Sequence, residues 1–269
     1  TRVRSSAASD VYKRQDNHGV LTIANGIGGA SAGDSVLTLN WSSDVQAPTI
    51  TWSVGSIGHI HSLWTHRVGT ENTGASLLFS GDDAQAIYSR NGHNGVGSWL
   101  VIASIAGQAG DIWRIDITPG SRFVRLTSGR QVNFAQWSPD GSAIDYLDAL
   151  SAGVGALHIV NAETGADRFI ANSVTNYPVA PAWSADSQQI AFSTGTRIGI
   201  ASVTGNNTHY LPLKGAAAAL IWSAATSHQL IVAMNDGQQG IFLADTQNGS
   251  SQQVDSQGTD GPLLWTLIP

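Results

Sequence analysis

The chain has 269 residues, of which 42% are hydrophobic and only 12% charged, with a formal net charge of −6. This hydrophobic content supports a folded core and argues against intrinsic disorder, while the scarcity of basic residues argues against a nucleic-acid or acidic-membrane partner. No apolar run approaches the roughly 18 residues of a membrane-spanning helix, so we expect no membrane insertion. The absence of Cys excludes disulfides, thiolate catalysis and Cys-ligated metal sites.

The first fifteen residues differ in composition from the rest of the chain. Residues 1–15 contain four basic residues and one acid, whereas residues 16–269 contain nine basic and 18 acidic residues. We therefore predict a non-native or disordered tail at 1–15 and a single domain at 16–269. The tail also resembles translated adapter sequence at the ends of metagenomic reading frames, so we expect the native N-terminus and any signal peptide to lie upstream. A natural basic tail is the alternative.

A strand-like run at 19–24 opens the predicted domain and is followed by a repeat. An aromatic residue next to a hydroxyl residue recurs at intervals of 39 to 49 residues. We call these six residues the repeat aromatics: Trp41, Tyr88, Trp137, Trp183, Trp222 and Trp265. A glycine that ends a strand-like run precedes each repeat aromatic by 14 to 18 residues. Two markers in one phase, with a period near 40–45 residues and short strands, predict a β-propeller.

The unit that begins at residue 132 has the clearest strand pattern. Runs with alternating apolar residues at 132–137, 143–147, 156–160 and 168–170 predict four strands, separated by turns rich in Gly, Pro, Asn and Asp. Asp140 and Asp186 each lie three residues after a repeat aromatic, which predicts Asx-type turns. We expect the repeat aromatics to be buried between neighbouring blades. A ring of carbohydrate-binding aromatics is the alternative.

The two ends of the chain predict how the ring closes. The run at 19–24 has the pattern of a third strand in a blade, and 261–269 that of a first strand. We therefore predict an all-β, six-bladed propeller of four-stranded antiparallel blades, in which the N- and C-terminal strands share one blade. No candidate for the second strand of that blade is visible before residue 19. We expect the closing blade to be one strand short, and six is a minimum number of blades.

Residues 137–141 read Trp-Ser-Pro-Asp-Gly and follow Asp-Ile-Trp-Arg-Ile-Asp at 111–116 and Arg-Leu-Thr at 125–127. This pattern resembles the TolB-type, WD40-like propeller repeat (PD40), with weaker copies at 183–187 and 41–44. The resemblance covers residues 17–269 and implies a propeller fold. The family includes periplasmic envelope proteins that bind protein partners, and non-catalytic propellers attached to peptidases. It therefore implies a periplasmic or extracellular location.

Two groups of residues are candidates for a site. His59 and His61 alternate on a predicted strand, so their imidazoles could meet one metal ion, although simple hydrogen-bonding polarity is the more ordinary reading. The lengthened turn from 90 to 97 carries Arg90, Asn91, His93 and Asn94, which we predict as a contact surface.

We expect a monomeric, non-catalytic scaffold without a cofactor, binding a protein or glycan partner through mouth loops or the central channel. The alternatives are a propeller lyase or hydrolase that uses a His-bound divalent metal, and the non-catalytic propeller of a peptidase.

Overall fold

The computed structural model describes residues 13–16, 19–22, 35–42, 48–56, 59–69, 75–89, 92–93, 97–105, 108–118, 121–151, 153–176, 179–204, 207–235 and 238–256. The elements of regular secondary structure in these ranges are β-strands, and none of the described residues belongs to a helix long and apolar enough to cross a bilayer. The chain divides into two compact units, Thr1–Arg130 and Gln131–Pro269, which we describe separately.

The first unit begins with a two-stranded antiparallel sheet. Strand β1 (Lys13–Asp16) pairs with β2 (Gly19–Thr22), and Gln15 lies opposite Val20. From the sequence we expected no strand before residue 19. This expectation is corrected, because β1 forms at Lys13–Asp16. The boundary of the tail at residue 15 stays a prediction.

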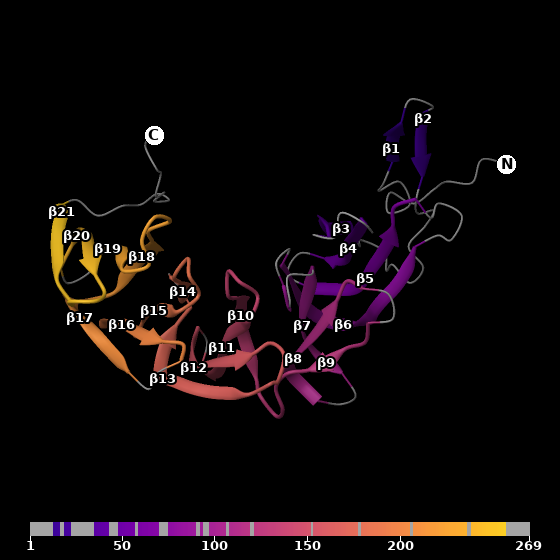
Figure 1. Cartoon of the computed structure of the whole chain (residues 1–269). Coiled ribbons are helices and arrows are strands. Elements are labelled where there is room, and N and C mark those ends of the chain that lie inside the picture. The colour runs from indigo at the N-terminus through magenta and orange to yellow at the C-terminus, as the bar shows by residue number, and fades with distance from the viewer. Residues whose placement is uncertain are drawn as a thin grey trace. The chain divides into compact units, whose positions relative to one another are not determined.

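The remaining strands of the first unit form a seven-stranded sheet in sequential order (Figure 1). They are β3 (Ser35–Trp41), β4 (Thr49–Ser56), β5 (His59–Arg67), β6 (Ser76–Ser89), β7 (Ser98–Ile105), β8 (Gln108–Asp116) and β9 (Val124–Arg125). The long strand β6 pairs with β5 through residues 76–84 and with β7 through residues 85–89. The sheet therefore contains two four-stranded antiparallel sets, since the fourth strand of one continues directly into the first strand of the next.

The second unit contains three four-stranded antiparallel sheets, each a simple meander. The first sheet has β10 (Val132–Trp137), β11 (Ala143–Ser151), β12 (Val154–Asn161) and β13 (Asp167–Thr175). The second has β14 (Ala182–Trp183), β15 (Gln189–Ser193), β16 (Arg197–Ser202) and β17 (Thr208–Lys214). The third has β18 (Ala217–Trp222), β19 (Gln229–Met234), β20 (Gly240–Asp245) and β21 (Ser251–Asp255). The four strands predicted for the unit at 132 are confirmed, and the last three extend further than the sequence indicated.

The turn after β10 shows why the repeat has its sequence. The Asp140 carboxylate accepts hydrogen bonds from the Ser138 hydroxyl (2.7 Å) and the Ser142 backbone N–H (3.0 Å). The Ser138 hydroxyl in turn accepts the Ala143 backbone N–H (3.0 Å), and Gly141 takes a positive φ of 72°. The same bonds recur around Ser184 and Asp186, so the predicted Asx-type turns are confirmed at both aspartates.

Apolar side chains of neighbouring sheets pack against each other in the second unit. One cluster joins Leu147 and Leu157 of the first sheet to Trp183 and Phe192 of the second. A second cluster likewise joins the second sheet to the third. Gly199 is required within this packing, because a Cβ atom there would lie 2.3 Å from the Phe192 ring.

The repeat aromatics differ in their environment. Trp137, Trp183 and Trp222 are buried, whereas Trp41 is 54% exposed, which corrects the expectation of burial there. Trp183 and Trp222 each donate their indole N–H to the sheet that precedes them in the chain. For Trp41, the preceding sheet would come from residues before Ser35, none of whose side chains lies within the described part of the chain. Trp265 also lies outside the described residues.

Candidate functional site

The predicted contact surface at 90–97 is described at one of its four named residues. Arg90, Asn91 and Asn94 lie outside the described residues. His93 is half-buried, and its Nδ1 atom lies 3.2 Å from Oδ2 of Asp116 at the end of β8. The other carboxylate oxygen of Asp116 accepts the Ser98 hydroxyl (2.9 Å) and lies 3.2 Å from Nε of Arg114. Asp116 therefore lies between the imidazole and the hydroxyl.

Two glycines allow the chain to approach this cluster closely. A Cβ atom at Gly92 would lie 2.5 Å from Cβ of Ser98, and one at Gly97 would lie 2.4 Å from the Tyr88 hydroxyl. The Tyr88 hydroxyl also donates a hydrogen bond to the Trp41 carbonyl (2.6 Å). Both ends of the lengthened turn therefore pack tightly against side chains of the strands β6 and β7.

The alternating histidines lie on β5, where the strand is irregular. Ile60 pairs with Gly55 of β4 and Ser62 pairs with Val54, so His61 has no residue opposite it. A bulged residue interrupts the alternation of side chains along a strand. The two-imidazole hypothesis needs this alternation to be regular, because only then do positions 59 and 61 share a face. The side chain of His59 lies outside the described residues, and those that are described contain no group of three or more potential metal ligands. A metal on His59 and His61 stays a prediction.

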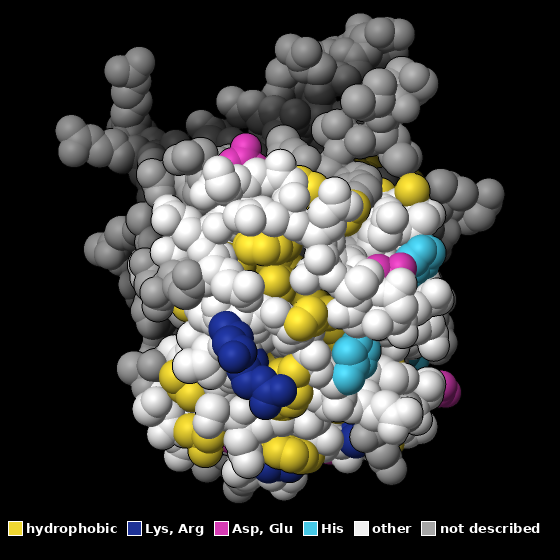
Figure 2. Space-filling view, turned by 90° about the vertical axis from the view of Figure 1, so that its left-hand side faces the viewer, with side chains coloured by type: hydrophobic (Ala, Val, Ile, Leu, Met, Phe, Trp, Pro, Cys, Tyr) yellow, Lys and Arg dark blue, Asp and Glu magenta, His cyan; other side chains and the backbone are white. Residues whose placement is uncertain are grey.

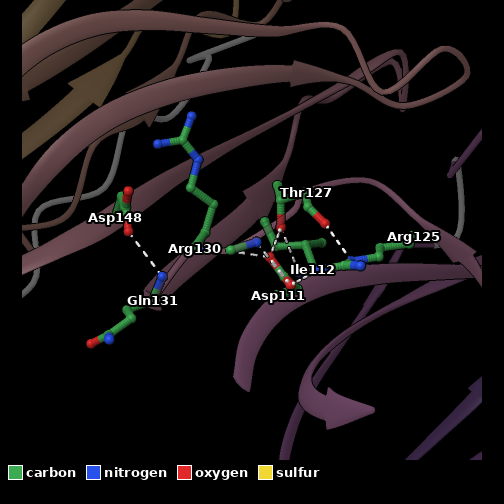
Figure 3. A network of polar contacts seen from close by, with 8 residues as sticks. Asp111, Ile112, Arg125, Thr127, Arg130, Gln131 and Asp148 are labelled. Atoms are coloured by element: carbon green, nitrogen blue, oxygen red, sulfur yellow. Dashed lines mark hydrogen bonds and ion pairs between the residues drawn. The ribbon is translucent and has the colours of Figure 1, made fainter. Parts of the chain in front are cut away.

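A buried aspartate organises the end of the first unit (Figure 3). Asp111 on β8 has no solvent exposure. Its carboxylate accepts hydrogen bonds from Nη2 of Arg125 (2.6 Å), the Thr127 hydroxyl (3.0 Å) and the backbone N–H groups of Gly129 (3.2 Å) and Arg130 (3.1 Å). Burial alone would raise the pKa of Asp111, but these four donors together lower it below its ordinary value. The carboxylate thus holds the segment that follows β9.

A second buried aspartate lies between two sheets of the second unit. Asp145 on β11 is fully buried and accepts hydrogen bonds from the Trp183 indole N–H and from Nε2 of Gln136 (3.2 Å). Gln136 also donates to the Pro181 carbonyl (2.7 Å). Burial raises the pKa of Asp145 to about 8, because only neutral donors reach the carboxyl group.

A third polar cluster lies on one sheet. Tyr146 and His158 are opposite each other on β11 and β12, and their rings stack with centroids 5.1 Å apart. The Tyr146 hydroxyl donates to Oδ2 of Asp167 (2.7 Å), and Nδ1 of His158 lies 3.0 Å from Oδ1 of the same carboxylate. As at Asp116, the carboxylate lies between the two other side chains.

The second unit has a surface depression of about 700 Å³ that was not expected from the sequence. Residues 195–197 and 210–215 line it, and they include Arg197, Tyr210 and Lys214. The scarcity of basic residues in the sequence pointed to it. Residues 131–269 contain only three Lys and Arg residues, and two of them line this depression.

No protein-family model matches the chain, and no curated protein matches it. Similar solved structures include an oligogalacturonate lyase in complex with manganese, with 12% identity, 93% of this chain and 69% of that chain covered, and a TM-score of 0.51. A puromycin hydrolase has 16% identity, with 90% of this chain and 41% of that chain covered, and a TM-score of 0.50. TolB from Acinetobacter baumannii has 17% identity, with 84% and 55% covered, and a TM-score of 0.43.

These likenesses concern the fold alone, because the identities are low. Together with the four-stranded antiparallel sheets, they show a β-propeller type of fold, and TolB proteins are among the structural neighbours. The chain spans less than two thirds of the length of the TolB and puromycin hydrolase chains.

Proposed function

We propose that this chain is a six-bladed propeller, closed by its terminal strands, that acts as a non-catalytic scaffold in the periplasm or outside the cell. Its partner is a protein or a glycan, and its contact surface is formed by Arg90, Asn91, His93 and Asn94. The fold likeness supports the scaffold, and the sequence resemblance to TolB-type repeats supports the location and the kind of partner.

The position of Asp116 is the observation that supports a structural role for this cluster. A serine nucleophile needs a base that accepts its proton directly, so the hydroxyl and the imidazole have to be hydrogen-bonded to each other. Ser98 instead donates to Asp116, and Nδ1 of His93 faces the other oxygen of the same carboxylate. This arrangement stabilises the base of the lengthened turn, which suits a surface that presents fixed contacts to a partner.

Photo-crosslinking tests the proposed surface. A photoreactive amino acid is placed at position 94 of the full chain, and a matched control carries it at Arg122, which is exposed in the same unit. After irradiation with an envelope extract and with a glycan array, we expect one discrete adduct or glycan class for position 94 and none for position 122. Equal labelling at both positions, or none at either, would overturn the proposed surface.

A turnover assay separates the scaffold from the metal-dependent alternative. The full chain is incubated with manganese and an acidic polysaccharide, and unsaturated or shortened products are measured. The scaffold predicts no turnover. Turnover that is lost in both His59→Ala and His61→Ala would reject the non-catalytic assignment.

A further inference from the structure

The depression in the second unit combines two basic side chains with an aromatic ring. Arg197 begins β16 and Lys214 ends β17, and these two residues lie directly opposite each other in the strand register. Figure 2 views the molecule from the flank where β17 and β21 lie in Figure 1, and it shows basic side chains next to hydrophobic ones on a largely uncharged face.

The register places two like charges together, although the unit has few basic residues. Residues 131–269 contain three Lys and Arg residues against ten Asp and Glu residues. The third basic residue, Arg168, donates to the Ser202 and Val203 carbonyls. Like charges directly opposite each other on neighbouring strands are destabilising, and no acidic residue lines the depression. An anion bound between Arg197 and Lys214 would remove this repulsion.

Tyr210 holds the guanidinium group in place. The Arg197 guanidinium carbon lies 3.7 Å from the centroid of the Tyr210 ring, and that ring meets Phe192 edge-on with centroids 6.3 Å apart. Stacking on an aromatic face fixes the plane of a guanidinium group, whose fork of N–H donors matches the two oxygens of a carboxylate. The plane of the Arg197 guanidinium group is therefore fixed before any ligand arrives.

The shape of β17 favours a small ligand over an added strand. Gly199 pairs with Tyr210 while Arg197 pairs with Lys214, so residues 211–213 bulge opposite Ile198. Pro212 in this bulge is exposed and has no backbone N–H to offer. Pro and Lys on a strand edge commonly serve only to block pairing with another chain. Edge protection does not account for a second cation placed opposite the Lys and stacked on an aromatic ring.

We propose that this depression binds a small ligand with a single carboxylate on a partly apolar ring, of the kind that a uronic acid presents. The carboxylate lies between Arg197 and Lys214, and the ring lies over the apolar lining that includes Pro212. A volume of about 700 Å³ accommodates one or two such rings. One carboxylate fits better than a polyanion, because the many acidic residues of the unit repel a ligand with several negative charges.

Calorimetric titration of the full chain tests this site with D-glucuronate and D-glucose, which differ only in the carboxylate. We expect glucuronate to bind and glucose to bind at least about tenfold more weakly, since charge-assisted bonds supply most of the affinity. Arg197→Gln and Lys214→Gln are each expected to weaken glucuronate binding about tenfold. The control Arg122→Gln makes the same change of charge in the other unit and is expected to leave binding unchanged.

Thermal unfolding provides a second readout that does not depend on the ligand. Lys214→Gln removes one of two facing like charges, so we expect its midpoint to equal or exceed that of the wild type, whereas Arg122→Gln leaves the midpoint unchanged. A lowered midpoint in Lys214→Gln would show that the cations are not in conflict and would overturn the argument from register.

Three results would overturn the proposed ligand. The first is glucose binding as well as glucuronate, and the second is glucuronate binding that survives both pocket substitutions. The third is tighter binding of inorganic phosphate or of an acidic peptide than of glucuronate. Because the contact surface at 90–97 belongs to the other unit, loss of crosslinking at position 94 leaves these outcomes unaffected, and the two proposals fail independently.

Discussion

Asp111 and Asp145 are both completely buried, yet their pKa values move in opposite directions. Asp111 accepts bonds from a guanidinium group, a hydroxyl and two backbone N–H groups, and its pKa is lowered despite burial. Asp145 accepts bonds from an indole, a side-chain amide and its own backbone N–H, all of them neutral, and burial raises its pKa to about 8. Burial sets the penalty for the charged form, and the number and charge of the donors decide whether it is overcome.

The two carboxyl groups consequently stabilise the protein in different ways. Asp111 is an ion that accepts bonds from a cation, a hydroxyl and two backbone N–H groups, so it ties the end of the first unit together. Asp145 is mostly a neutral acid at pH 7, because its pKa of about 8 lies above that pH. It links two sheets only through neutral hydrogen bonds.

Replacing Asp111 by Ala has the largest effect that we predict. The change removes the carboxylate that accepts from Nη2 of Arg125 and from the backbone N–H groups of Gly129 and Arg130, while Arg125 keeps its bond to the Thr127 carbonyl. Losing the acceptor of several donors at once costs about 3 kcal/mol in the free energy of unfolding. Urea denaturation of the purified chain measures this loss. A loss no larger than that of an exposed substitution such as Arg122→Ala would show that the carboxylate does not hold this segment.

Asp145 predicts how stability changes between pH 4 and pH 8. Because its folded-state pKa of about 8 lies above the ordinary value of 3.8, its stabilisation is fully present below about pH 4 and is lost as the pH rises towards 8. We expect the free energy of unfolding to fall by at most roughly 1.4 kcal/mol per pH unit in this range. The pKa values of Asp111, Asp140 and Asp186 are lowered, so their contributions are lost only as the pH falls below about 4.

The variant Asp145→Asn isolates this effect. Asn does not titrate, so the slope between pH 4 and pH 8 is expected to flatten. At pH 5 the variant loses about 1 kcal/mol, because its amide N–H group faces the Gln136 amide. Denaturation curves recorded across this pH range measure both quantities. An unchanged slope in the variant would assign the pH dependence to other groups.

Local sequence patterns predicted the sheets because they are built from contacts that lie close together in the chain. The turns after Trp137 and Trp183 make their hydrogen bonds between residues at most five positions apart, and both formed as expected. The shared strand β6 was not foreseen. Asp82 and Asp83 in its middle are residues typical of a turn, yet they belong to the strand, and only pairing with β5 and β7 distinguishes its two halves.

Side-chain clusters were harder to predict, because they depend on register between strands. Asp145 meets Trp183 across 38 residues, and Arg197 faces Lys214 only because β17 bulges. Trp41 is exposed although its sequence context matches that of Trp183, which is buried against a neighbouring sheet. Equivalent repeat positions therefore share backbone geometry more reliably than environment.

Trp183→Phe changes the donors of Asp145 while keeping most of the aromatic bulk. The variant loses the indole N–H bond, so the pKa of Asp145 rises further and the stability falls by about 1 kcal/mol. The pH at which the stabilising contribution of Asp145 is fully lost therefore moves upwards. Denaturation curves recorded between pH 7 and pH 9 measure this shift. Trp222→Phe is the matched control, since it loses a bond to the Ala182 carbonyl and no carboxyl group. A similar shift in both variants would contradict a specific effect on Asp145.

Arg125→Lys has the smallest effect and tests whether Asp111 needs a guanidinium group or only a positive charge. Arg125 donates to Asp111 and also to the Thr127 carbonyl (2.9 Å), and its guanidinium carbon lies 5.6 Å from the Trp113 ring centroid. Lys keeps the charge but cannot make both bonds in the same plane, so we expect a loss of about 0.5 to 1 kcal/mol. Arg125→Gln removes the charge as well and is expected to lose more, because the pKa of Asp111 then rises towards that of an uncompensated buried acid. If the Lys and Gln variants were equally stable in urea, the neutral donors alone would keep Asp111 ionised, and the contrast with Asp145 would rest on the number of donors and not on their charge.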